Sequence, residues 1–139
     1  MKFFSYVKPD AFKENEDILH MLSHAGYKII SKAAHTITEK EANELYVQHE
    51  GRPYFERLIT HTTSGPSLLL FLNHPKAGIK EFRELIGNSD PGKAAEGTIR
   101  KLFGNATLYA QGIPANAIHG SDSEKNFFRE ISIFEEVFP

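Results

Sequence analysis

The sequence contains no cysteine, so it can form neither a disulfide nor a thiolate metal site, and it fits a reducing compartment. It also lacks any apolar run long enough to span a bilayer. The apolar start, residues 3–7, is too short for a signal peptide and is followed at once by Lys8-Pro9-Asp10. We therefore expect a cytoplasmic protein with no membrane partner.

An excess of positive charge is missing too. There are 16 Lys and Arg residues against 18 Asp and Glu, and the net charge is −2. This balance does not favour a nucleic-acid partner held by overall charge, so a bound anion would need a local cluster of basic groups. Repeats, low-complexity tracts and linkers are also absent, and 139 residues suffice for one core. We expect residues 1–139 to form a single domain.

Hydrophobic periodicity predicts the elements of that domain. Strands are predicted over residues 3–7, 27–37, 67–72 and 130–134, the last from alternating residues. Helices are predicted over residues 17–25, 38–49, 54–59, 79–86 and 123–129, with a short helical piece at 93–95. Residues 98–103 are ordered but of uncertain type, and 104–114 look like a loop. The order predicts an α/β (α+β) fold, a ferredoxin-like βαββαβ sandwich whose four-stranded antiparallel sheet is covered by helices.

One stretch concentrates chemistry, and it reads Asn116-Ala117-Ile118-His119-Gly120-Ser121-Asp122-Ser123. Its histidine is the one side chain there that can act as a nucleophile near neutral pH without a metal or a second base. The glycine after it would let a bulky group approach the ring. Taken alone, the stretch also fits a polar turn before a helix, with a hydrogen-bonded histidine in it.

A second histidine pattern invites a metal-site interpretation. His20 and His24 are four residues apart on a predicted helix, a spacing that metal ligands use. They project from the face opposite the apolar stripe, and no third ligand is evident. The pattern favours a solvated helix face.

The octapeptide around His119 resembles the active-site signature of the nucleoside diphosphate kinases, which reads Asn, two variable residues, His, Gly or Ala, Ser, Asp and a small residue. Further matches follow in that family's order along essentially the whole chain. They are Lys8-Pro9-Asp10-Ala11, Tyr46, Arg52-Pro53-Tyr54-Phe55, Ser64-Gly65-Pro66, Arg83-Glu84-Leu85-Ile86-Gly87, Asn88-Ser89-Asp90-Pro91, Gly97-Thr98-Ile99-Arg100 and Glu130-Ile131-Ser132.

The resemblance implies a ping-pong transfer. His119 would take the γ-phosphate of a nucleoside triphosphate on one ring nitrogen and hand it to a nucleoside diphosphate. Glu130 would hydrogen-bond the other ring nitrogen, with Ser121 nearby, and Tyr46 would lie near the histidine. Without the resemblance, Glu130 would be read as a solvent-facing carboxylate on a strand.

The same resemblance assigns the phosphate-binding groups. Lys8, Arg83 and Arg100 would supply positive charge, and the Ser89 hydroxyl would bind phosphate. Lys8 and Asn116 would also reach the sugar hydroxyls. The cofactor Mg²⁺ would be carried mainly by the phosphates, with no ligand from protein side chains.

The base would stack on Tyr54 with Leu58 behind it, and stacking without edge recognition implies broad base specificity. Tyr54 stands where the family usually has phenylalanine, and Ser89 where it usually has threonine. Both replacements keep the group that the role needs.

Residues 104–115, between Phe103 and Asn116, replace a connection that is usually shorter in the family. There the connection borders the nucleotide site, including the position of Ile113, and the contacts between subunits. The family assembles as symmetric dimers built up to tetramers or hexamers, so we expect a homo-oligomer. This chain ends soon after the last predicted strand, without the longer tail that some members use between subunits.

There are two alternative functions. A nucleotide-binding or regulatory module on the same fold could have lost turnover through the altered loop. The intact His119, Arg83 and Arg100 favour an active kinase instead. A nucleic-acid-binding or transcriptional role has no basic stripe to support it.

Overall fold

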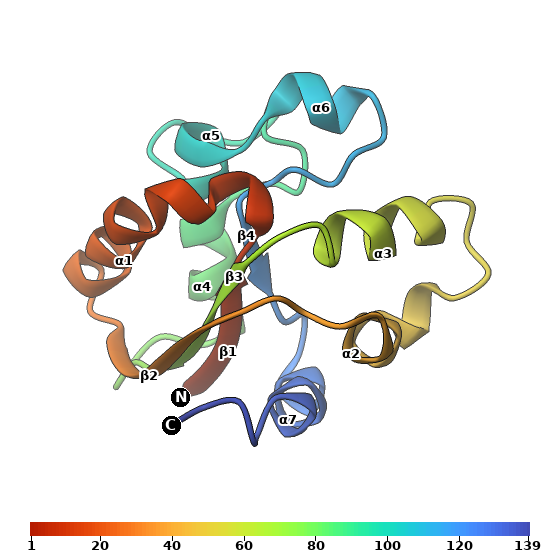
Figure 1. The fold of residues 1–139 in the computed structure, drawn as a ribbon. Helices are drawn as coiled ribbons and strands as arrows, with labels where there is room; N and C mark the ends of the chain where they lie inside the picture. The colour runs from red at the N-terminus through yellow and green to blue at the C-terminus, as the bar shows by residue number, and fades with distance from the viewer.

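A four-stranded antiparallel sheet forms the centre of the protein in the computed structural model, which describes residues 1–139 (Figure 1). Its strands lie in the order β2-β3-β1-β4. Their bounds are β1 Lys2–Val7, β2 Lys28–His35, β3 Ser67–Asn73 and β4 Ile118–Gly120. All three pairings are antiparallel. The predicted ferredoxin-like βαββαβ architecture is therefore confirmed.

Helices cover both faces of this sheet. The 3₁₀ segments are η1 (Pro9–Glu14) and η2 (Val47–His49), and the α-helices are α1 (Asn15–His24), α2 (Glu39–Leu45), α3 (Phe55–Thr62), α4 (Ile79–Ile86), α5 (Ile99–Phe103), α6 (Ala106–Ala110) and α7 (Glu124–Ile133). None of them combines the length and the apolar character that crossing a membrane requires.

Alternation along β1 divides the core in two. Phe3 and Val7 pack with α1 and α4 on one face, and Phe4 and Tyr6 pack with α2, α3 and α7 on the other. All of β1 from Phe3 onward is buried because the strand has a neighbour on each side and helices on each face. This central strand positions the end of the chain, since β4 pairs with it alone.

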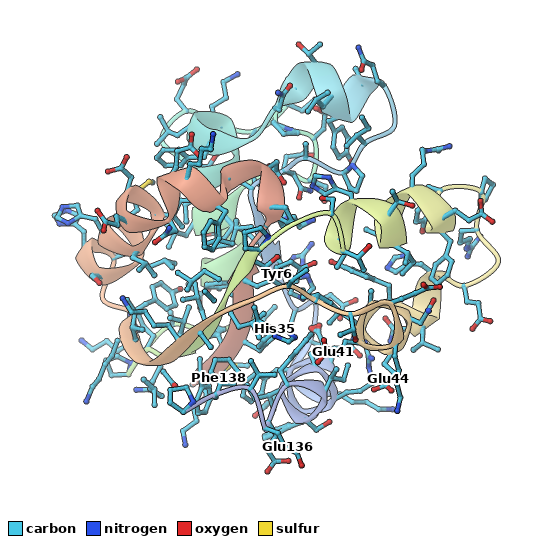
Figure 2. All side chains as sticks on the ribbon, viewed as in Figure 1. Tyr6, His35, Glu41, Glu44, Glu136 and Phe138 are labelled. Atoms are coloured by element: carbon cyan, nitrogen blue, oxygen red, sulfur yellow. The ribbon has the colours of Figure 1, made fainter.

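Thr38 caps the start of α2. Its hydroxyl accepts from the backbone N–H of Glu41, and Glu41 accepts from the backbone N–H of Thr38, which starts α2. Glu41 also lies 2.8 Å from Nε2 of His35 at the end of β2, and Figure 2 shows the two side chains together. The contact joins β2 to α2, the helix that leads to Tyr46.

The strand predicted over residues 130–134 is wrong. Residues 130–133 continue α7 and Phe134 is its C-cap; Phe127, Glu130 and Phe134 are buried at helical spacing. The last strand is β4, which contains His119 itself. Three residues are too few to show a period of two, and β4 is stabilised by its pairing with β1, more than a hundred residues earlier in the chain.

Smaller differences concern the connections. The predicted loop 104–114 contains α6, whose first turn is capped when Asn105 accepts from the N–H of Leu108. Residues 98–103 contain α5, and residues 93–95 form turns instead of the predicted helical piece. His20 and His24 are both exposed, in agreement with the solvated-face interpretation.

Gly87, after α4, gives a test of this packing. Its φ of +95° and ψ of −179° lie in a region that only glycine adopts readily, and an added Cβ would approach Oγ1 of Thr98 to 2.6 Å. We expect Gly87→Ala to lower the free energy of unfolding by about 1–3 kcal/mol, measured by urea denaturation. Gly65→Ala is the control, because the nearest atom to its Cβ, on Pro9, is 3.8 Å away. Equal stability of the two variants would contradict the prediction.

Candidate active site

His119 lies on β4, and the start of the chain holds this strand in place. Ala117, two residues before it, has a φ of +73°, the only positive value outside glycine. Its N–H donates to Oδ2 of Asp10 at 3.0 Å, and its carbonyl accepts from the N–H of Lys8 at 2.8 Å. His61 lies 2.8 Å from the other oxygen of Asp10. The conformation before the histidine is therefore fixed by the segment that follows β1.

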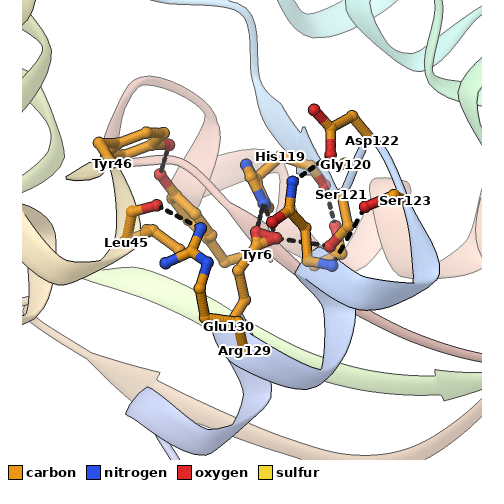
Figure 3. A network of polar contacts seen from close by, with 12 residues as sticks. Tyr6, Leu45, Tyr46, His119, Gly120, Ser121, Asp122, Ser123, Arg129 and Glu130 are labelled. Carbon is orange, nitrogen blue, oxygen red and sulfur yellow. Dashed lines mark hydrogen bonds and ion pairs between the residues drawn. The ribbon is translucent and has the colours of Figure 1, made fainter. Parts of the chain in front are cut away.

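The imidazole of His119 is anchored by one nitrogen. Nε2 lies 3.0 and 2.9 Å from the two carboxyl oxygens of Glu130, and Oγ of Ser121 donates to the same carboxyl at 2.6 Å (Figure 3). Burial raises the pKa of Glu130, but the charge and hydrogen bond of His119 and the bond from Ser121 outweigh it and lower the pKa overall. A carboxylate only accepts, so Nε2 carries the proton and Nδ1 keeps a free lone pair.

Aromatic rings surround the imidazole. Tyr6 stacks on it with ring centroids 5.2 Å apart and planes inclined by 19°, and Phe4 is tilted against it. Tyr46 meets it edge-on at 85°, with 6.1 Å between centroids. Figure 3 shows Tyr6 and Tyr46 with their hydroxyls together beside the histidine. Aromatic side chains therefore contact the ring, while Nδ1 makes no hydrogen bond within the chain.

A cavity of about 540 Å³ lies against His119. Every predicted site residue lines it, namely Lys8, Tyr46, Tyr54, Leu58, Arg83, Ser89, Arg100, Asn116, His119, Ser121 and Glu130. These residues come from segments spread over the whole sequence. The fold therefore brings the predicted residues to one place.

The three predicted phosphate-binding cations, Lys8, Arg83 and Arg100, line this cavity together with Arg57 and Arg129. None of the five makes a salt bridge within the chain. Burial, and then the charge of Arg100, lower the pKa of Lys8 to about 7. Burial, and then the charge of Arg83, lower the pKa of Arg100 to about 10. The guanidinium of Arg100 donates to the carbonyls of Gly87 and Ile118 at 3.1 and 2.8 Å, while its buried Nε has no partner. Such a cluster favours a bound anion.

The cavity is also lined by polar side chains that could form further hydrogen bonds. Asn116 donates to the carbonyl of Ser89 at 3.0 Å, which leaves its buried Oδ1 without a donor. The hydroxyl of Tyr54 lies 2.6 Å from Nδ1 of His49, and its ring is 41% exposed. Leu58 is buried beside it on α3. These side chains offer an accepting amide and an open aromatic face.

Comparison with known proteins agrees with this geometry. Residues 2–137 match the family model described as nucleoside diphosphate kinase. The nucleoside diphosphate kinase of Bdellovibrio bacteriovorus is 39% identical over 135 residues, covering 96% of this chain and 91% of the relative. That of Rickettsia bellii is 41% identical over 133 residues, covering 94% and 90%. The chain belongs to the nucleoside diphosphate kinase family. It is accordingly a nucleotide-binding phosphotransferase.

Solved structures of nucleoside diphosphate kinases have the same fold. The Aquifex aeolicus enzyme superposes with a TM-score of 0.85 at 32% identity, covering 96% of this chain and 93% of that one. The Halobacterium salinarum enzyme, in complex with CDP, superposes with a TM-score of 0.86 at 33% identity, covering 100% and 91%.

The segment of residues 104–115, which includes α6, makes a hydrogen bond with α3. Nε of Arg57 donates to the carbonyl of Gly112 at 3.0 Å. Gly112 has a φ of +87°, and a Cβ there would lie 2.9 Å from that nitrogen, so only glycine fits under the guanidinium. Ile113, the residue after Gly112, and Tyr54, the N-cap of α3, both line the cavity. The contact therefore joins two walls of the cavity.

Sequence reasoning did not assign seven other polar or charged residues to the cavity: Gln48, His49, Arg57, Tyr109, Asp122, Asn126 and Arg129. Arg57 had a local signal, because it lies one helical turn after Tyr54. Arg129 had none, since its guanidinium donates to the carbonyls of Glu44 and Leu45 at 2.7 and 3.1 Å, far away in sequence. Those bonds tie α7 to the end of α2.

Removing the Arg57 side chain should loosen the loop. We expect Arg57→Ala to speed hydrogen exchange at the amides of Gly112 and Ile113 by about fivefold, since a net hydrogen bond is worth about 1 kcal/mol. Exchange measured by mass spectrometry or NMR checks this. Arg52→Ala is the control, because Arg52 is exposed and lies outside the cavity. Unchanged exchange in Arg57→Ala would show that the contact does not hold the loop.

Proposed function

We propose that the protein transfers the γ-phosphate of a nucleoside triphosphate to a nucleoside diphosphate by a ping-pong reaction through a phosphohistidine at His119. One observation carries the proposal: Glu130 occupies Nε2 and leaves Nδ1 free on a histidine that lines the same cavity as Lys8, Arg83 and Arg100, none of which makes a salt bridge. A neutral imidazole in this tautomer is a competent nucleophile at physiological pH.

In the first half-reaction the Nδ1 lone pair forms a bond to the γ-phosphorus. The bond from that phosphorus to the bridging oxygen breaks, and the nucleoside diphosphate leaves with the electron pair. The proton on Nε2 stays there, and the Glu130 carboxylate stabilises the positive charge that develops on the ring. The second half-reaction is the reverse with another diphosphate, so one site serves both nucleotides.

The remaining residues bind and position the nucleotide. Lys8, Arg83 and Arg100 stabilise the charge on the phosphate oxygens during transfer. The free Oδ1 of Asn116 accepts a hydrogen bond from a sugar hydroxyl, and Lys8 donates one to a sugar hydroxyl. The Ser89 hydroxyl binds phosphate. We propose that Tyr46, whose ring meets that of His119 edge-on, lies next to the phosphate that is transferred.

For the base, Tyr54 offers a face with Leu58 behind it, and stacking of this kind gives broad base specificity. The Halobacterium salinarum relative was solved with CDP, which supports a nucleoside diphosphate as ligand here. Magnesium would enter with the nucleotide and neutralise phosphate charge, because the chain has no cluster of carboxylates that could hold the ion.

We also propose a homo-oligomer, dimer-based and built to a tetramer or hexamer, in the cytoplasm, as the family resemblance implies. The outer strand β2 leaves its edge free in the sheet, and half of its residues are exposed. Analytical ultracentrifugation gives the number of subunits, and a monomer at micromolar concentration would contradict the assembly.

Transfer of label from γ-labelled ATP tests the reaction. With magnesium, the wild-type protein should acquire an acid-labile, alkali-stable label that disappears when GDP is added. We expect no label on His119→Ala and full label on His20→Ala, a matched exposed histidine outside the cavity. If the wild type binds GDP tightly but takes no label, it is a binding module and the proposed reaction is wrong.

The lowered pKa of Lys8, about 7, gives a pH dependence. Above pH 7 the free protein holds Lys8 neutral, while a bound phosphate favours the ammonium, so binding takes up a proton. Affinity for a nucleoside diphosphate should therefore fall between pH 7.5 and 9, by at most about tenfold per pH unit. Calorimetry at pH 8 in buffers of different ionisation enthalpy should show uptake approaching one proton in the wild type. Lys8→Arg stays charged and should show none; equal uptake by both proteins would contradict this assignment.

A further inference from the structure

Tyr6 lies beside His119 but has no role in the reaction proposed above. The two residues are direct cross-strand partners in the β1–β4 pairing, so their side chains emerge next to each other on one face of the sheet. Their rings stack at 5.2 Å. Tyr6 is fully buried and does not line the cavity, so it cannot reach a substrate directly.

The hydroxyl of Tyr6 makes a hydrogen bond to the hydroxyl of Tyr46. Figure 3 shows this bond at the side of the imidazole, and Figure 2 shows Tyr6 in the middle of the molecule. Burial raises the pKa of both phenols, so both stay protonated. Tyr46 does line the cavity, and therefore Tyr6 is the inner member of a pair whose outer member faces the substrate.

This arrangement supplies what the Glu130 contact lacks. A ring held by Nε2 alone can still swing about that anchor, and its other nitrogen then sweeps over a range of directions. Tyr6 packs against one face of the ring, and Phe4, tilted by 55°, also contacts it. Reactions at a nucleophile are sensitive to such displacement, because the attacking lone pair must lie in line with the bond that breaks.

We propose that Tyr6 is a positioning residue for phosphoryl transfer at His119. Its ring sets the plane of the imidazole that presents Nδ1, and its hydroxyl holds the Tyr46 hydroxyl beside the position that the phosphoryl group takes. This inference rests on the reaction proposed above. It requires Tyr6 to affect the rate of transfer and leave nucleotide binding nearly unchanged.

Two substitutions separate the ring from the hydroxyl. Tyr6→Phe keeps the stacked ring, so we expect the rate of labelling of His119 at saturating ATP to fall about fivefold, the effect of one lost hydrogen bond, with KM for ATP within about twofold. Tyr6→Leu also removes the aromatic face, and the rate should fall about a hundredfold. Tyr27→Phe is the control, since it removes a phenol hydroxyl from the opposite core, away from the site.

A double substitution tests whether the hydroxyl acts through Tyr46. If it does, Tyr6→Phe added to Tyr46→Phe should leave the labelling rate within about twofold of Tyr46→Phe alone, because the bond is already gone. A full further fivefold loss would overturn this part of the proposal. Thermal unfolding of each variant shows whether the rates belong to a folded protein.

NMR of the unliganded protein gives a readout that needs no activity. The ¹⁵N shifts of His119 should show the Nε2–H tautomer in the wild type and in Tyr27→Phe, and exchange-broadened or mixed tautomers in Tyr6→Leu. If the wild type takes label while Tyr6→Phe and Tyr6→Leu match Tyr27→Phe in rate and spectrum, the role of Tyr6 is overturned and the reaction stands. If the wild type takes no label, the reaction falls, and unchanged His119 spectra in Tyr6→Leu would overturn the positioning role too.

Discussion

The contact between Nε2 of His119 and the carboxylate of Glu130 is the interaction on which the site depends. A histidine with both nitrogens free would exist as two tautomers, and half of its orientations would present a proton to an incoming phosphate. A buried acceptor on one nitrogen removes that choice. The carboxylate in turn stays charged in a buried position because His119 and Ser121 stabilise it. Each side chain therefore provides the hydrogen-bond partner that the other needs in order to be buried.

The buried cations beside the cavity lower the free energy of unfolding of the empty protein. Lys8 and Arg100 are each 6% exposed, and their pKa values are lowered by burial and by neighbouring positive charge. Without a bound anion their charges repel each other across a poorly hydrated space. In the function proposed above, a bound polyphosphate would relieve that repulsion, so part of the energy for binding the nucleotide would be stored in the fold beforehand. The left-handed residue Ala117 is a second stored strain at the same place.

The sheet determines how these groups meet. His119 is on a three-residue edge strand that would not persist alone, and β1 supplies its pairing on one side and Tyr6 beneath its ring. The segment after β1 then supplies Lys8 and Asp10, which bind the backbone of Ala117. The strand β1 and the segment that follows it thus position His119, Lys8 and the left-handed residue Ala117.

Local pattern in the sequence was enough for β1, β3, α4 and the cap of α2, since in each the periodicity or a capping residue lies within a few positions. The motif around His119, with its resemblance over the whole chain, selected eleven of the residues that line the cavity, and the roles given to them stay predictions. The tertiary structure alone decided that residues 130–133 are helical and that β4 holds His119, because a short alternating run fits either element until its packing partner is present. It alone decided the contacts of Tyr6 with His119 and of Arg57 with Gly112. Both join residues more than fifty positions apart, and no local period encodes such a distance.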